Sequence, residues 1–107
     1  MLKDNEKITL TADEAIKVLS EVEYMLISLR DIARYYYHRR DEEVTEEIQG
    51  EYCKETTRFI DENRITNRLA HIRKIISEKF NDELGKDDMD DVEREMEKIK
   101  YWEKPGD

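Results

Sequence analysis

The sequence has 107 residues, close to the usual length of one small domain, and carries a formal net charge of −9. Charged residues make up 44% of it and hydrophobic residues 37%, so we expect a single helical domain over 1–107 with a narrow core and flexible ends at 1–10 and 103–107. Its apolar runs are too short for a signal peptide or a membrane span, and a lone cysteine excludes an internal disulfide. These features predict a cytoplasmic protein with no contact with membranes.

The first predicted helix begins at about Ala12. Thr11 supplies the N-cap, and Glu14 stands three residues later to complete a capping box. Apolar residues then recur at spacings of three and four as far as about residue 39, namely Ala15, Val18, Val22, Met25, Leu29, Ile32 and Tyr36, with Leu19, Leu26 and Ala33 beside them. This stripe is wider than one neighbouring helix covers, which predicts that the helix is the central element of the fold.

Two further helices are predicted between residues 42 and 80. A stripe from Val44 to Phe59 indicates a helix over about 42–62, and a second stripe runs from Ile65 to Phe80. On a helical wheel the two stripes are turned by roughly a third of a revolution, so one straight helix would not bury both. We therefore expect a break near Asn63, a residue type that tolerates the left-handed conformation in which helices end.

A fourth helix is predicted after Gly85, with Asp87 or Asp88 as its cap. It would carry apolar residues at spacings of three and four, namely Met89, Val92, Met96 and Ile99. The expected fold class is all-α, a small antiparallel bundle of three to four helices with a long central first helix.

Charge is unevenly distributed along the chain. Residues 41–63 hold nine acidic and two basic residues, 64–80 hold one acidic and five basic, and 81–107 hold eleven acidic and five basic. A strongly negative field attracts basic partners and repels nucleic acid. We therefore expect a protein partner and not free DNA or RNA.

Three consecutive tyrosines at 35–37 point in three directions on a helix, so at least one lies outside the core. Tyr and Arg are enriched at the energetic centres of protein interfaces. The candidate partner-binding residues are Arg30, Arg34, Tyr35, Tyr37, His38, Arg39, Glu42, Glu43, Glu46 and Glu47. The leading hypothesis is a non-enzymatic module of the inhibitor, antitoxin, immunity or phage anti-defence type, whose carboxylates would stand in for nucleic-acid phosphates.

Motifs for metal, cofactor or nucleophilic chemistry are missing from the sequence. Its two histidines stand in no H-E-x-x-H or E-x-x-H arrangement, and the acidic run from Asp87 to Asp91 lacks the order of an EF-hand loop. We therefore expect no metal site, no cofactor and no enzymatic activity.

The run from Asn67 to His71 resembles part of the R-N-x-x-x-H signature of HEPN domains, which are small helical bundles and often ribonucleases. The resemblance implies an alternative function, a degenerate HEPN-like ribonuclease or its inactive relative, that would use Arg64, Arg68 and His71. The chain departs from the signature five residues before His71, where Thr66 stands in place of arginine. A third alternative is a structural homodimer in which the broad face of the first helix packs against its copy.

Overall fold

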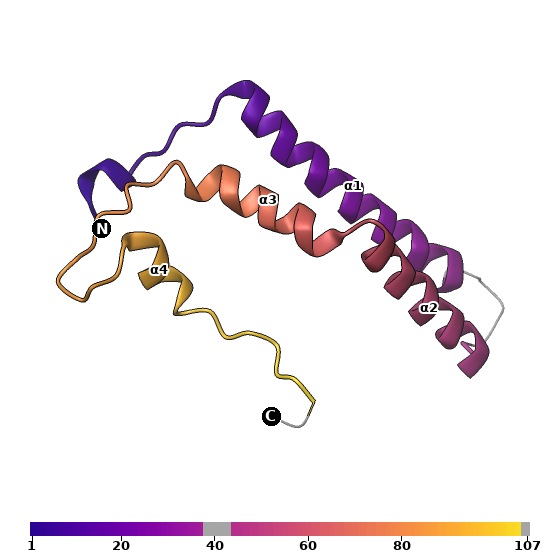
Figure 1. The fold of residues 1–107 in the computed structure, drawn as a ribbon. Helices are drawn as coiled ribbons and strands as arrows, with labels where there is room; N and C mark the ends of the chain where they lie inside the picture. The colour runs from indigo at the N-terminus through magenta and orange to yellow at the C-terminus, as the bar shows by residue number, and fades with distance from the viewer. Residues whose placement is uncertain (38–43, 106–107) are drawn as a thin grey trace.

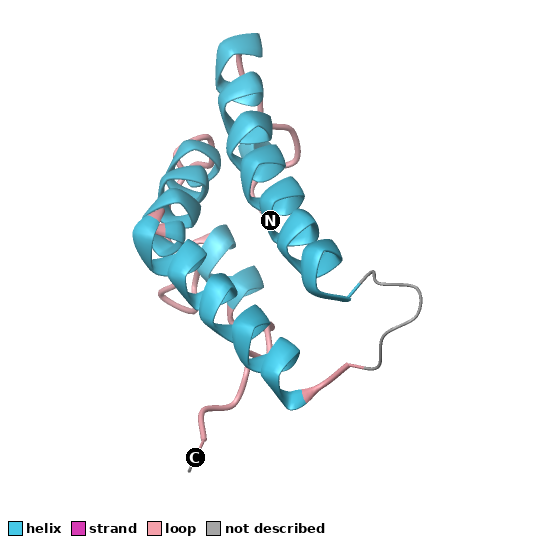
Figure 2. Ribbon diagram, turned by 90° about the vertical axis from the view of Figure 1, so that its right-hand side faces the viewer, coloured by secondary structure: helices cyan, strands magenta, loops and turns pink. Residues whose placement is uncertain are grey.

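The computed structural model describes residues 1–37 and 44–105, and within these ranges every regular element is a helix (Figure 2). In chain order these elements are the short 3-10 helix η1 (Lys3–Asn5) and the helices α1 (Ala12–Tyr37), α2 (Glu46–Glu62), α3 (Ile65–Ser77) and α4 (Asp91–Met96). The predicted all-α fold with a long first helix is confirmed. None of the described helices is long and apolar enough to cross a membrane.

The predicted capping box starts α1. The Thr11 backbone N–H donates to Glu14 Oε1 at 3.0 Å, and the Glu14 N–H donates to Thr11 Oγ1 at 3.1 Å. The Glu14 carboxylate also pairs with Lys79, which follows α3, and so ties the start of α1 to the segment after α3. Together the Lys79 ammonium and the Thr11 hydrogen bonds lower the pKa of Glu14 to about 2.

Helix α1 packs against both α2 and α3, which run back along it in the opposite direction (Figure 1). The break between α2 and α3 falls where the two stripes require it, but the left-handed residue is Arg64, with φ 49°, and not Asn63, with φ −94°. Asn63 ends α2 through its side chain instead, since its Nδ2 donates to the Phe59 carbonyl at 3.0 Å. The left-handed conformation that changes the direction of the chain is therefore adopted by the next residue, Arg64.

The hydrophobic core lies where the three helices meet. Met25 from α1, Phe59 from α2 and Ile65 from α3 are buried, and Ile32 and Ile72 pack against them. We call these five residues the junction core. It is small for a chain of 107 residues, and it leaves much of the apolar surface of α1 outside it.

Helix α4 is shorter than predicted and is capped by a different residue. The Asp90 side chain accepts the Glu93 N–H at 2.7 Å, whereas Asp88 has a left-handed backbone, with φ 59°. The predicted caps at Asp87 and Asp88 are therefore wrong. Ile99 lies beyond the end of α4 and is exposed, because α4 lies beside the end of α3 and the segment that follows it extends away from the helices (Figure 1).

The molecule is elongated, measuring 57 × 39 × 24 Å, with a radius of gyration of 19.1 Å. A compact domain of the same length would have a radius of gyration of about 13 Å. The difference arises because α1, α2 and α3 form a long, thin layer with α4 attached at one end (Figure 1).

Gly50 and Gly85 have opposite surroundings, which predicts opposite effects of substitution by alanine. A Cβ at Gly50, inside α2, would meet nothing within 4 Å, so Gly50→Ala should stabilise the fold by about 1 kcal/mol through helix propensity. A Cβ at Gly85 would lie 2.7 Å from Arg94 Nη2, and the bonds of Arg94 to Asp87 and Asp91 prevent the guanidinium from moving aside freely, so Gly85→Ala should destabilise the fold. Urea unfolding followed by circular dichroism measures both, and equal effects of the two substitutions would contradict the prediction.

Candidate protein-binding surface

Four tyrosine rings meet at the end of the α1–α2 hairpin. Tyr37 lies edge-on to Tyr52 of α2 with ring centroids 4.8 Å apart, and Tyr36 lies edge-on to the same ring at 6.4 Å. Tyr35 continues the series, 4.9 Å from Tyr36. These contacts hold the last turn of α1 against α2, about one helical turn beyond Ile32 of the junction core. We call the four residues the tyrosine cluster.

The members of the tyrosine cluster differ in exposure. Tyr36 is half-buried, whereas Tyr35 keeps 65% of its surface exposed and Tyr37 keeps 37%. Burial raises the pKa of Tyr36, with the Glu55 carboxylate adding to the effect, and burial also raises the pKa of Tyr37. Both phenols therefore stay neutral at physiological pH and keep their hydroxyl groups as hydrogen-bond donors.

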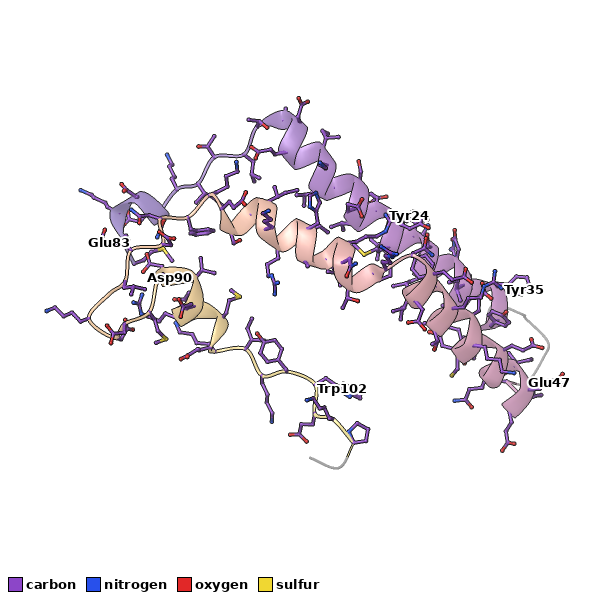
Figure 3. All side chains as sticks on the ribbon, viewed as in Figure 1. Tyr24, Tyr35, Glu47, Glu83, Asp90 and Trp102 are labelled. Carbon is purple, nitrogen blue, oxygen red and sulfur yellow. The ribbon has the colours of Figure 1, made fainter. Side chains whose placement is uncertain are left out.

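The acidic candidates within the structure lie beside this cluster. Glu46 and Glu47 occupy the first turn of α2, which Thr45 caps by accepting the Ile48 N–H at 3.2 Å. Figure 3 shows Tyr35 and Glu47 at the same end of the molecule. Four other predicted residues, His38, Arg39, Glu42 and Glu43, lie outside the described residues.

The basic candidates Arg30 and Arg34 lie further back on α1 and are exposed. At 100° per residue they are turned by roughly 100° or more from Tyr35, so they share a side of α1 with Tyr37 and not with Tyr35. The structure thus places Tyr35, Tyr37, Glu46 and Glu47 at the same end of the molecule, with Arg30 and Arg34 on the side of α1 that carries Tyr37.

The ribonuclease candidates Arg64, Arg68 and His71 line one open hollow of about 380 Å³. Asn67 of α3 and Glu21 of α1 also line this hollow. The left-handed turn at Arg64 and the helical spacing of the others bring these residues to one side of the break between α2 and α3.

Arg68 makes contacts that join α3 to α1. Its Nη1 donates to Glu21 Oε2 at 3.0 Å, its Nε donates to the Asn63 carbonyl at 2.9 Å, and its guanidinium lies 4.6 Å from the centroid of the Tyr24 ring. The Tyr24 hydroxyl in turn donates to Asn63 Oδ1 at 2.7 Å. The charge of Arg68 is therefore already engaged within the chain.

A buried polar cluster forms at the other end of the molecule, and no pattern in the sequence pointed to it. Asn5 Nδ2 donates to Asp91 Oδ2 at 2.7 Å and to the Asn81 carbonyl at 3.0 Å, while Asn5 Oδ1 accepts the Asn81 N–H at 2.7 Å. Both Asn5 and Asp91 are buried. We call this cluster the Asn5 clamp, because it ties residues 1–5 to the segment after α3 and to α4.

Arg94 completes the Asn5 clamp and takes up the acidic run that precedes α4. Its Nη1 donates to Asp91 Oδ1 at 2.8 Å, and it forms a two-pronged pair with Asp87 at 2.7 and 2.9 Å. Since Asp90 caps α4, three of the run's carboxylates have structural partners. Within residues 1–37 and 44–105, no group of three or more His, Cys, Asp or Glu side chains is arranged to hold a metal ion.

Comparison with known proteins gives no relative: no protein-family model matches the chain, and no curated protein and no solved structure is significantly similar to it.

The Asn5 clamp predicts how the protein responds to acid. The Asn5 amide, with the Leu2 N–H and Arg94, lowers the pKa of Asp91 from 3.8 to about 2, so the clamp contributes stability above pH 3.8 that is lost as the pH falls towards 2. Asn5→Ala removes the largest of these contributions and should raise the pKa of Asp91 towards 3.8. It should also lower stability by about 2 kcal/mol, because buried partners lose their hydrogen bonds.

An NMR titration of the Asp91 carboxyl and urea unfolding at several pH values measure the two effects. Asp82→Asn is a suitable control, because it changes a nearby carboxylate outside the clamp. An Asp91 pKa that stays at about 2 in Asn5→Ala would contradict the assignment.

Proposed function

We propose that the chain is a cytoplasmic, non-enzymatic protein-binding module that occupies a surface of a larger partner, as inhibitors, antitoxins, immunity proteins and phage anti-defence proteins do. The observation that supports this proposal is the tyrosine cluster at the end of the α1–α2 hairpin, with Tyr35 exposed at the same end of the molecule as the acidic first turn of α2.

Exposed tyrosines that are already held in place suit a binding surface. Tyr bears a large apolar ring and a hydroxyl group, and it loses little conformational entropy when a partner covers it. In the tyrosine cluster the edge-on contacts of Tyr36 and Tyr37 with Tyr52 restrict the rings before any partner arrives. An aromatic group that is already ordered in the free protein lowers the entropy cost of binding another protein, and so favours binding.

The charge beside the cluster favours a basic partner. Helix α2 carries six acidic and two basic residues. Arg58 pairs with Glu55 and Glu62, but within the described ranges Glu46 and Glu47 have no ion pair. Their carboxylates are therefore available to meet lysines or arginines, and on a nucleic-acid enzyme they would occupy the place of phosphates.

Site-specific crosslinking tests the proposal. A photoreactive phenylalanine derivative in place of Tyr35, introduced in the cells that make the protein, should yield one discrete adduct with another polypeptide. Glu46→Gln together with Glu47→Gln should lower the yield of this adduct severalfold, because the attraction to a basic partner weakens.

The same derivative in place of Trp102 provides the matched control. Trp102 is an aromatic residue that is 92% exposed and lies far from the tyrosine cluster (Figure 3), and it should give no such adduct. Adducts of equal yield from both positions, or a yield unaffected by the two glutamine substitutions, would refute the proposed surface.

A ribonuclease is the second candidate, and one observation favours it: Arg64, Arg68 and His71 line the same hollow. It ranks second because the Arg68 guanidinium is bound to Glu21 and the Asn63 carbonyl and is less available to an RNA phosphate.

This candidate predicts cleavage of RNA by the purified protein. His71 is exposed, so His71→Ala should abolish that cleavage and leave the helical circular dichroism spectrum unchanged. Arg73→Ala, on the same helix and outside the hollow, is the control. Absence of cleavage in the wild-type protein would remove this candidate.

A further inference from the structure

Helix α1 bears a second apolar stripe whose larger side chains the rest of the chain leaves exposed. Its members recur at spacings of four, three, four, three and four, the repeat of a coiled-coil seam: Ala15, Leu19, Val22, Leu26, Leu29 and Ala33. We call these residues the open stripe. Leu19 is 57% exposed and Leu26 is 55% exposed, and Val22 and Leu29 are also exposed.

The open stripe lies beside the face that α1 turns towards its neighbours. Met25 and Ile32 belong to the junction core, and Glu21 binds Arg68 of α3. On a helical wheel, Leu19 and Leu26 are turned by roughly 100° from Met25. In a four-helix bundle a helix has two neighbours on adjacent faces, about a right angle apart. The chain fills one of these positions next to α1 and leaves the other vacant.

The molecule exposes more surface to solvent than a compact protein of its mass does. The accessible surface is 9394 Å², whereas a compact monomer of 13.0 kDa would expose about 6,300 Å². The excess of about 3,000 Å² is spread over the whole elongated molecule and includes the open stripe, whereas a standard interface buries roughly 800 Å² on each partner. The open stripe spans about 27 Å of helix, long enough to form the centre of such an interface.

The charges along the edge of the open stripe select a second copy as its occupant. Glu23 and Arg30 are exposed on that edge, seven residues apart, and neither forms an ion pair within the described part of the chain. In an antiparallel pairing with Leu26 against Leu29 of the second copy, Glu23 and Arg30 of that copy lie on the same edge, about 3 Å apart along the helix axis. Two-fold symmetry repeats the pair. A parallel pairing would leave the two charges about 10 Å apart along the axis.

We propose that the open stripe is the interface of a homodimer in which α1 packs antiparallel against α1 of a second copy. The dimer has a central pair of α1 helices, each covered on its adjacent face by its own α2 and α3. Leu26 meets Leu29, and Val22 meets Ala33, in symmetric layers that the Glu23–Arg30 pairs flank. The tyrosine cluster stays outside the central layers, so this proposal does not depend on the protein partner proposed above.

Sedimentation equilibrium of the full chain from about 1 to about 100 µM tests the proposal. The wild type should reach twice the monomer mass of 13.0 kDa. Leu19→Glu with Leu26→Glu should raise the dimer Kd at least a hundredfold and leave the circular dichroism spectrum unchanged, because neither residue belongs to the junction core. Leu84→Glu, at a side chain 58% exposed outside α1, should leave the dimer intact.

Charge exchange tests the antiparallel register. Glu23→Arg should raise the dimer Kd about tenfold, and adding Arg30→Glu to the same chain should restore it, because each pair is re-formed with its charges reversed. If the variant with both Leu19→Glu and Leu26→Glu loses helicity, the variant with Leu19→Ala and Leu26→Ala replaces it in this test. A wild type that is monomeric at the highest concentration, a dimer that survives the leucine substitutions, or a failure of Arg30→Glu to restore association would each overturn the proposal.

Discussion

The contact of Met25, Phe59 and Ile65 is the interaction on which the rest of the structure depends, because each of the three residues comes from a different helix. A core this small contributes little hydrophobic free energy, so the helices also rely on polar contacts around it. Tyr24, Asn63 and Arg68 supply these contacts next to the core, where a hydroxyl, an amide and a guanidinium link all three helices. The segment from Arg64 to His71 therefore has a structural role, because Arg68 within it links the three helices.

A second consequence of the small core is that each end of the molecule is held together by its own set of contacts. At one end the tyrosine cluster holds the hairpin together through aromatic edges and leaves Tyr35 exposed. At the other end the Asn5 clamp holds residues 1–5 and α4 through hydrogen bonds and charge, with little apolar burial. Residues 1–10, expected to be a flexible end, therefore include a buried asparagine whose amide is fully engaged.

The same scarcity of core explains the surface of α1. An apolar stripe that extends over two adjacent faces of a helix needs a neighbour on each face. Helices α2 and α3 follow one another along α1 and cover only one of those faces. The proposed partner surface and the proposed dimer interface use different parts of this helix: its last turn carries the tyrosines, and its middle carries the leucines. One helix can therefore serve both associations at once.

The sequence by itself determined α1, α2 and α3, because their signals are local. The capping box at Thr11 and Glu14, the three-and-four spacing along α1 and the turn between the stripes of α2 and α3 each act within a few residues, and each was found where expected. The width of the α1 stripe led to the prediction of a central helix, and part of that stripe, including Leu19 and Leu26, is exposed.

Only the tertiary structure decided which carboxylates are structural and which face of α1 stays open. As helix caps, Asp87, Asp88 and Asp90 look alike in the sequence. In the structure Asp90 caps α4, while Asp87 binds Arg94 instead. The pairing of Asn5 with Asp91 joins residues 86 positions apart, and such a contact leaves no periodic trace. Long-range polar contacts depend on where the chain returns in space, and neither propensity nor spacing encodes that.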